Sequence, residues 1–253
     1  MSQALQRVIV CMLYDPDLRE RVYGGENLPQ LTAKQMRQLR CQPRQAWRTD
    51  PYLSSRTLQG LIEEYLTSVA VTGVGHLHKF FSSTLFHECV QTRGWIAVAF
   101  GHWLRPHAGR LSVLECAIAQ ARRRVCPLLK KGSVAVGDGV FPMTLPMDTM
   151  HQYQGVRERL GSNALQALLS NDFEVVELPP ESKAQEYWIV TTDQGGSVSV
   201  AGGTEALNGL LVRAIEPTTM QQLREVAVSL GASGKEADDI LCDLEVEGLL
   251  KVR

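Results

Sequence analysis

The sequence contains no long apolar run. Its longest apolar stretches, VIVCML and WIAVAF, are far shorter than the roughly 20 residues that a membrane-spanning helix needs. The first residues also lack the basic segment, apolar segment and small-residue cleavage site of a secretory signal. We therefore expect a cytoplasmic chain with no membrane partner.

Motifs for structural metals, disulfides and nucleotides are missing as well. The six cysteines form no CxxC pair and no zinc-like spacing, and without a secretory signal we expect reduced, mostly buried thiols. The glycine segments VGDGV and TDQGGS match neither a GxGxxG helix start nor a phosphate-binding loop. Both segments are predicted to be turns.

The histidines give the strongest argument for chemistry in the chain itself. The segments GHLHKFFSSTLFHEC and GHWLRPH hold several of them, but no pair has the one-turn spacing that places two ligands on one helix face. We expect surface, capping or interface histidines. A metalloprotein stays open as an alternative, with candidate ligands His76, His78, His87 and His102.

The charge is divided unevenly along a chain of otherwise ordinary globular composition. The 253 residues are 44% hydrophobic and carry a net charge of -1. Residues 172–253 hold six Lys or Arg against fifteen Asp or Glu, whereas residues 1–171 hold 20 against 12. Such an asymmetry bears on the partners that each part can attract.

The first two-thirds of the chain is predicted to be helical. ALQRVIVCMLYDPDLRERVYGG has apolar residues at helical spacing, a stop and restart at Asp15 and Pro16, and two terminal glycines, which together indicate a helical hairpin. Thr32 with Gln35, and Ser112 with Glu115, have capping-box spacing. We expect a bundle of about six or seven helices that ends near residue 125.

The pattern changes near residue 133. SVAVGDGVFPMTLPMD predicts an extended crossover, and TMHQYQGVRERLGSNALQALLS predicts a helix or helix pair. FEVVEL is then a predicted strand, EYWIVTT and SVSVA a hairpin around DQGG, and three helices follow. The predicted fold class is α+β: a helical domain over residues 1–165 and a winged-helix-like domain of three strands and three helices over 166–253.

The last helix argues against DNA as the partner of this second domain. It carries six acidic residues and Lys235 alone as a basic one, so a DNA groove would repel it. The remaining use of the shape is peptide capture, in which an extended peptide adds to an exposed strand. The predicted docking strand is Ser197, Val198, Ser199, Val200 and Ala201, and the predicted groove residues are Asp239, Cys242, Asp243 and Val246.

Alternation along the docking strand predicts that Val198 and Val200 face one way, and that Ser197, Ser199 and Ala201 face the other. Alternating valines are also what a purely structural wing would contain. Because strand addition uses backbone groups, the pattern alone leaves both interpretations open.

These residues resemble a known family. The order of strand, hairpin and three helices, ending in EADDILCDLEVEGLLKV, is similar to the recognition element of ribosomally synthesised peptide (RiPP) biosynthesis. The earlier segments ALQRVIVCMLYDPDLRERV, RLSVLECAIAQARRR and VAVGDGVFPMTLPMD resemble the partner subunits of multinuclear non-haem iron-dependent oxidative enzymes (MNIOs). That family includes the partners in methanobactin and 3-thiaglutamate synthesis, and the resemblance is nearest to the latter.

The resemblance implies a non-catalytic subunit. It would bind the leader of a precursor peptide, form a heterodimer with a separate iron enzyme, and present the cysteine-containing core of the peptide to that enzyme. No cofactor is expected in this chain, since the iron would belong to the partner, and no nucleic acid is expected. A winged-helix DNA-binding regulator and the histidine metalloprotein are the alternatives.

Overall fold

Capping side chains set where most helices begin. In the computed structural model, which describes residues 2–47, 50–170, 173–193 and 195–253, Asp15 caps the helix that starts at Pro16. Thr32 and Gln35 form the predicted capping box. Because each cap satisfies amides that the first helical turn leaves without partners, the helix starts are encoded locally.

Contacts divide the chain into two units, each of which is discontinuous in sequence. Unit 1 comprises Met1–Ser112 and Gln154–Leu178, and unit 2 comprises Val113–Tyr153 and Pro179–Arg253. This division does not coincide with the single boundary between residues 165 and 166 that the sequence predicts. The predicted crossover belongs to unit 2, where it supplies two strands.

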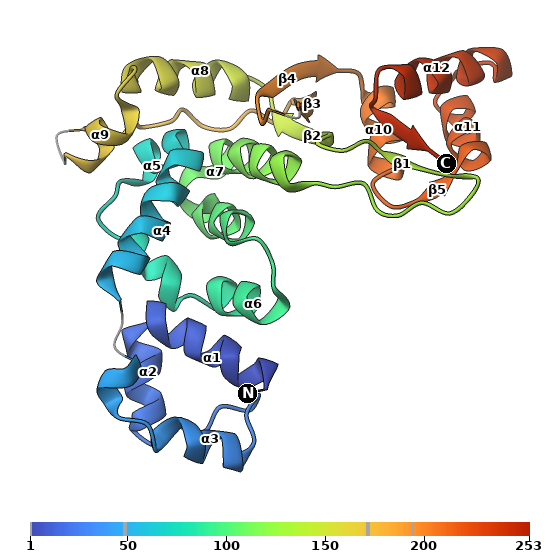
Figure 1. Cartoon of the computed structure of the whole chain (residues 1–253). Helices are drawn as coiled ribbons and strands as arrows, with labels where there is room; N and C mark the ends of the chain where they lie inside the picture. The colour runs from blue at the N-terminus through green and yellow to red at the C-terminus, as the bar shows by residue number, and fades with distance from the viewer. Residues whose placement is uncertain (1, 48–49, 171–172, 194) are drawn as a thin grey trace. The chain divides into compact units, whose positions relative to one another are not determined.

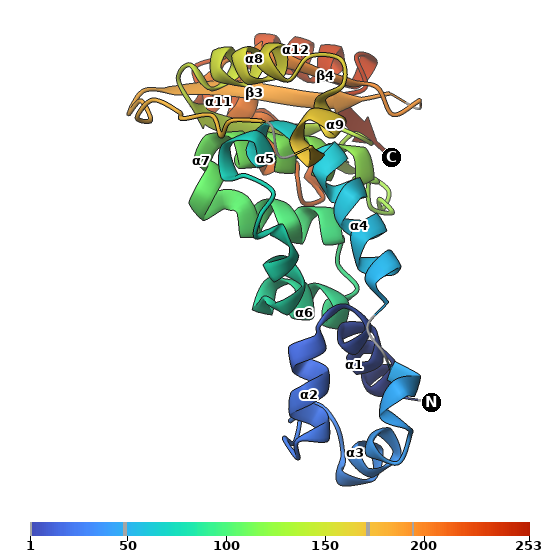
Figure 2. The ribbon, with the colours of Figure 1, turned by 90° about the vertical axis from the view of Figure 1, so that its left-hand side faces the viewer.

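Unit 1 is built from helices (Figures 1 and 2). They are α1 (Gln3–Tyr14), α2 (Pro16–Tyr23), α3 (Ala33–Arg40), η1 (Arg44–Trp47), α4 (Pro51–Glu64), α5 (Leu66–Thr72), η2 (Leu77–Ser82), α6 (Thr84–Thr92), the first part of α7 (Ile96–Arg123), the last part of α8 (Thr149–Leu160) and α9 (Ala164–Leu169). The predicted hairpin of α1 and α2 is confirmed, as is the helix pair α8 and α9. The helix α7 runs on where a new start was predicted at Ser112, but its backbone breaks at Gly109 (φ 49°, ψ -125°).

Unit 2 combines two three-stranded sheets with helices. Its elements are the last part of α7, β1 (Ser133–Val136), β2 (Phe141–Pro146), the first part of α8, β3 (Gln185–Thr192), β4 (Val198–Gly203), α10 (Glu205–Arg213), β5 (Thr218–Thr219), α11 (Met220–Ser229), α12 (Gly234–Val246) and β6 (Leu250–Val252). One sheet has the order β5-β1-β6 and the other β2-β3-β4, and all pairs are antiparallel. The chain is therefore an α+β protein, with the predicted hairpin and three C-terminal helices in place.

One predicted strand is wrong. Residues 173–178 form no strand, and the amide of Val176 instead donates to the carbonyl of Ala70 in unit 1 (3.0 Å). The third strand beside the hairpin is β2, which comes from the predicted crossover. A strand pattern in the sequence gives no information on which distant segment will supply the pairing partner, and here β2 occupies that position.

Two hydrophobic cores hold the strands of unit 2. Leu114, Ala117 and Ile118 of α7 cluster with Met143, Leu145 and Val190 on one face of the β2-β3-β4 sheet. The second core joins β1, β3 and the helices α10 to α12; its buried members are Val134, Val136, Val140, Ile189, Leu211, Ala214, Leu223, Leu241, Leu244 and Leu250. Each sheet of unit 2 therefore contributes residues to a buried core.

The turn between β1 and β2 is tightly enclosed. Gly139 has a left-handed backbone (φ 70°), and a Cβ atom there would overlap the hydroxyl of Thr192. The amide of Gly139 donates to the carbonyl of Arg124 (3.1 Å). This glycine thus lets the chain pass from one sheet to the other against β3.

We expect Gly139→Ala to lower the free energy of unfolding by roughly 2–4 kcal/mol, from left-handed strain and overpacking together. Urea unfolding of the full chain measures it. Gly155→Ala is the matched control, because the helical Gly155 has open space around its Cα, and there alanine should stabilise the helix by up to about 1 kcal/mol. Equal effects of the two substitutions would contradict the enclosed turn.

Candidate peptide-binding site

The hydrogen bonds of β3 alternate between its two neighbours. The amide of Thr192 donates to the carbonyl of Gly139 on the β2 side (3.0 Å), and the amide of Asp193 donates to the carbonyl of Ser197 on the β4 side (3.1 Å). Because neighbouring residues of an antiparallel strand bond in opposite directions, the even-numbered residues of β3 bond to β2 and the odd-numbered residues bond to β4.

The register then shows which groups of β4 point outward. Val198 lies opposite Thr192, and Val200 lies opposite Val190; both of these β3 residues bond to β2. The backbone groups of Val198, Val200 and Gly202 therefore point away from β3, and none has a hydrogen-bond partner among the described residues. We call these groups the β4 edge.

The opposite edge of the same sheet is closed by proline. By the same alternation, the outward residues of β2 are Pro142, Thr144 and Pro146. Proline has no amide hydrogen, so two of these three positions are unable to donate to an added strand. The outward positions of β4 thus keep the amide donors that two of the three outward positions of β2 lack.

Side chains of β4 follow the predicted alternation. Val198 and Val200 are partly buried against the core that α7 contributes, whereas Ser199 and Ala201 are exposed. Ser197 lies just before β4, and its amide donates to the carboxylate of Asp193 in the turn (2.8 Å). The side chains of the two valines therefore have a structural role. The backbone groups of the same two residues point outward from the sheet.

The predicted groove residues share one face of α12. Asp239, Cys242, Asp243 and Val246 are all exposed, and Val246 is 81% exposed. Their spacing places them opposite the buried Ala237, Leu241 and Leu244. We call these four residues the α12 outer face.

The β4 edge and the α12 outer face are separate surfaces of unit 2. Ala201 pairs with Ile189, and Ile189 shares a core cluster with Leu241 and Leu244 of α12. The strand and the helix therefore border the same core, and Figure 1 shows β4 running toward the helices α10 to α12. The α12 outer face lies on the side of the helix opposite the residues that pack into this core, so it points away from the core.

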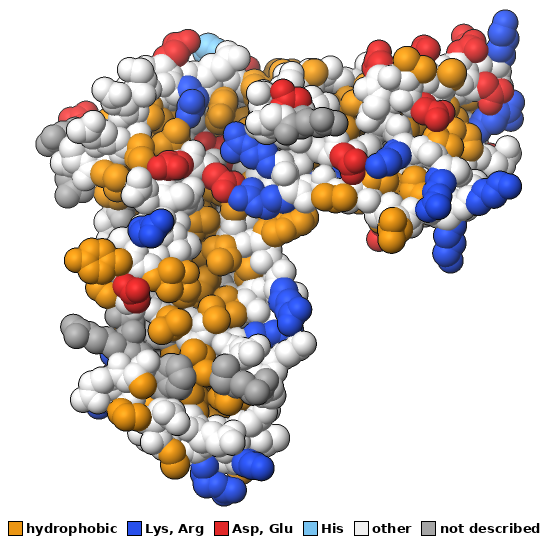
Figure 3. All heavy atoms as spheres, viewed as in Figure 1, with side chains coloured by type: hydrophobic (Ala, Val, Ile, Leu, Met, Phe, Trp, Pro, Cys, Tyr) orange, Lys and Arg blue, Asp and Glu red, His pale blue; other side chains and the backbone are white. Residues whose placement is uncertain are grey.

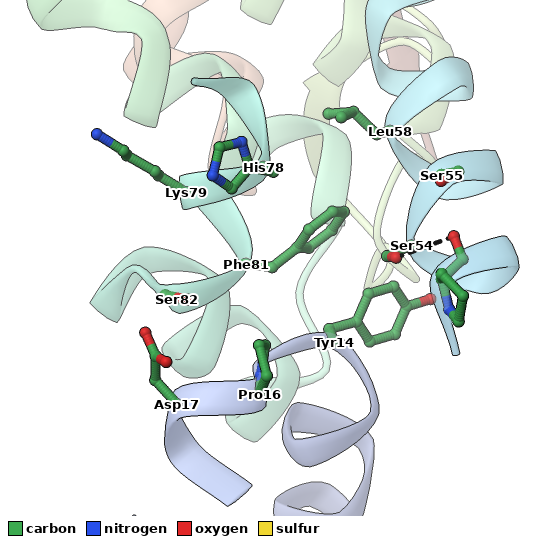
Figure 4. Close-up of a pocket in the computed structure, with 11 residues that line it drawn as sticks. Tyr14, Pro16, Asp17, Ser54, Ser55, Leu58, His78, Lys79, Phe81 and Ser82 are labelled. Carbon is green, nitrogen blue, oxygen red and sulfur yellow. Dashed lines mark hydrogen bonds between the residues drawn. The ribbon is translucent and has the colours of Figure 1, made fainter. Parts of the chain in front are cut away.

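Unit 1 has a pocket of its own, which the sequence did not predict (Figure 4). Its volume is about 730 Å³. The rings of Tyr14 and Phe81, 5.0 Å apart, form an apolar wall with Leu58, and exposed polar side chains such as Asp17 and Lys79 stand at the rim. These residues come from α1, α2, α4 and η2, so only the tertiary fold brings them together.

A buried carboxylate, that of Asp15, lies at the junction of α1 and α2 beside this pocket. Asp15, 1% exposed, accepts hydrogen bonds from the amides of Asp17 and Leu18 (3.0 and 3.2 Å) and from the Ser82 hydroxyl (3.0 Å). The Nε2 atom of His87 lies 3.0 Å from its other carboxylate oxygen. Burial acts to raise the pKa of Asp15, but the nearby His87 imidazole and the hydrogen bonds from the Leu18 amide and Ser82 outweigh it and lower that pKa.

We expect Asp15→Asn to lower the free energy of unfolding at pH 7 by about 1–3 kcal/mol, because a charged acceptor with several donors is lost. The folded pKa of Asp15 is below its unfolded value, so its contribution exists above about pH 4 and is lost as the pH falls through the folded pKa. Urea unfolding of both proteins from pH 7 to pH 3 should show the difference narrowing at acid pH.

The control is Asp17→Asn, which removes an exposed carboxylate from the same helical turn. It should have a smaller effect, since Asp17 contributes mainly through the helix dipole. A gap between wild type and Asp15→Asn that stays constant down to pH 3 would show that the Asp15 charge is not what matters.

The candidate metal ligands are spread over unit 1. His87 pairs with Asp15, His76 meets the ring of His107 edge-on at 5.8 Å, and His78 lines the pocket. Among the described residues, no group of three or more His, Cys, Asp or Glu side chains is placed to hold a metal ion. His102, the remaining candidate ligand, is exposed on α7.

The cysteines are free thiols, and four of the six are buried. Burial, with the nearby Asp15 carboxylate, raises the pKa of Cys11 to about 12. Cys41 and Cys242 are exposed, and Cys242 lies on the α12 outer face.

Comparison of the sequence with protein-family models and with curated proteins gives no match to either. Within the described ranges, no helix is both long enough and apolar enough to cross a membrane. The interpretation of the site therefore rests on its geometry and on the sequence resemblance.

Proposed function

We propose that the chain is a non-catalytic subunit that binds the leader of a precursor peptide and presents the cysteine-containing core to a partner iron-dependent oxidative enzyme. The observation that carries the proposal is the β4 edge, where Val198, Val200 and Gly202 direct backbone groups outward from a sheet whose other edge is closed by prolines. An extended peptide that adds there would satisfy these groups, each bond contributing about 0.5–1.5 kcal/mol.

The side chains around the β4 edge suit a bound strand. Side chains of the added peptide would alternate between the α7 side of the sheet and the side on which Ser199 and Ala201 are exposed. Both residues are small, so an adjacent peptide side chain meets little steric hindrance there. Peptide capture by this edge therefore needs no rearrangement of the sheet.

The α12 outer face supports a preference for basic leaders. Asp239 and Asp243 are exposed on it, and most of the other acidic residues of α12 are exposed as well; Arg224 pairs with Asp238 (2.7 Å). A leader that runs along β4 toward the C-terminal helices would bring Lys or Arg side chains near these carboxylates. The same charges disfavour a nucleic acid on this helix.

The catalytic chemistry would belong to the partner enzyme. Holding the leader on this subunit makes delivery of the core peptide effectively intramolecular, which raises its local concentration at the enzyme. The iron would be held by the enzyme, and this chain would provide orientation.

The first test is calorimetric titration of the full chain with synthetic leader peptides of cysteine-containing RiPP precursors. We expect the wild type to bind and Val200→Pro to lose at least about tenfold in affinity, because proline removes the outward amide at that position. The full chain is required, since a fragment starting at residue 166 would lack both β1 and β2.

Val200→Ala is the matched control for this test. It removes the same partly buried side chain but keeps the amide, and so it should bind the leader nearly as well as the wild type. If alanine and proline weaken binding equally, or if the wild type does not bind, strand addition at the β4 edge is wrong.

A charge reversal distinguishes the effect of the α12 carboxylates from the effect of the net charge of the chain. Asp239→Lys/Asp243→Lys should weaken binding of a basic leader by about tenfold at low salt and much less at high salt, as screened charge attraction requires. Glu216→Lys/Glu225→Lys makes the same change in net charge at exposed positions outside α12. Calorimetry at two salt concentrations compares the pairs, and equal effects would show that only net charge matters.

A further inference from the structure

The segment between α7 and β1 holds two apolar side chains out in solvent. Val125 is 78% exposed and Leu128 is 95% exposed. Between and beside them, Cys126 and Leu129 are buried in a cluster with Ala135 of β1. The loop is therefore fixed by alternate residues, and its exposed apolar side chains are held in place.

The same segment, together with the last two residues of α7, is strongly basic. Residues 122–131 contain Arg122, Arg123, Arg124, Lys130 and Lys131 and no acidic residue. Arg123 and Arg124 donate to the carbonyls of Ala119 (2.9 Å) and Ile215 (2.8 Å), whereas Arg122, Lys130 and Lys131 are exposed. We call residues 122–131 the basic loop.

A pocket of about 600 Å³ adjoins the basic loop within unit 2. Arg122, Arg124 and Lys251 line it together with Asp138 and Asp193. Asp138 already accepts hydrogen bonds from the Cys126 amide and from Lys251 (3.1 Å), and Asp193 accepts one from the Ser197 amide. Arg122 has no partner among the described residues, so this pocket has a cation available for a carboxylate from outside.

Charge is segregated within unit 2. Figure 3 shows Asp and Glu side chains gathered over α12, and Lys and Arg side chains along the opposite margin of the same unit. Unit 2 as a whole has more acidic than basic residues, so the basic loop is a local exception to its surroundings. A partner that binds there has to be acidic only where it meets the loop.

We propose that the basic loop is a docking surface for a protein whose surface places carboxylates around an apolar socket. Leu128 and Val125 would enter the socket, and Arg122, Lys130 and Lys131 would face the carboxylates. Two aliphatic side chains on a short fixed loop are too few to hold a chain on a bilayer, whereas a protein socket can enclose both. Under the proposed function, on which this identification rests, the partner is the iron-dependent oxidative enzyme.

The test measures the dissociation constant between the full chain and a purified MNIO enzyme, the class of partner that the proposed function names. We expect Leu128→Ser and Lys130→Glu/Lys131→Glu each to weaken enzyme binding by at least about tenfold, since interface anchors and facing charges carry such effects. The controls are Val228→Ser, a half-exposed apolar position on α11, and Lys183→Glu, an exposed charge outside the loop. Both controls should bind like the wild type.

Leader binding is measured on the same samples, which separates the two proposals. Loop variants that keep leader affinity but lose the enzyme support the docking surface. Loop variants that bind the enzyme as tightly as the wild type overturn it, even where leader binding is confirmed. A wild type that binds the leader but not the enzyme overturns the docking surface and leaves the peptide site intact.

Two further measurements test whether the basic loop instead binds a lipid membrane or a second copy of the chain. Flotation with vesicles of phosphatidylcholine and phosphatidylglycerol would overturn the proposal if Leu128→Ser abolished vesicle binding without affecting the enzyme. Light scattering at increasing protein concentration measures self-association. The proposal would be overturned if the loop variants abolished self-association while leaving the affinity for the enzyme unchanged.

Discussion

The hydrogen bonds that β3 makes to its two neighbours determine which residues of β2 and β4 direct their backbone groups out of the sheet. Its even-numbered residues are bound to β2 and its odd-numbered residues to β4, so the outward groups of the sheet fall on Pro142, Thr144 and Pro146 at one edge and on Val198, Val200 and Gly202 at the other. Had the register slipped by one residue, the prolines would have faced β3 and interrupted the ladder. The same register that accommodates the prolines therefore makes Val198, Val200 and Gly202 the residues of β4 whose amides point outward.

Sheet edges are usually protected against further pairing by proline, charge or a covering element. The edge at β2 is protected in the first of these ways. The edge at β4 has no proline and no charged residue within the strand, and its exposed side chains, Ser199 and Ala201, are small. An edge left open on one side of a sheet that is closed on the other is the physical basis for expecting a strand-shaped ligand.

The sequence predicted the features whose determinants are local. Capping residues such as Asp15 and Thr32 lie within a few positions of the amides that they bind, and the alternation of Val198 and Val200 is visible without the partner strand. The failures are non-local. FEVVEL has a strand-like pattern, but the position beside β3 was taken by residues 141–146, which looked only like an extended crossover. The pairing of β2 with β3 also determines which residues of β4 direct their amides outward, so these residues were not predictable from the sequence either.

Charge connects the two proposed surfaces. The sequence showed an acidic C-terminal third, from residue 172 onward. The structure resolves unit 2 into an acidic α12 and a basic loop that is supplied by residues 122–131, well before that third. Because the loop and α12 have opposite charge, a basic leader would be repelled from the loop, and enzyme carboxylates that face the loop would be repelled from α12. Under the proposed function, such separation would let one small unit hold two partners at once, which delivery of a tethered peptide requires.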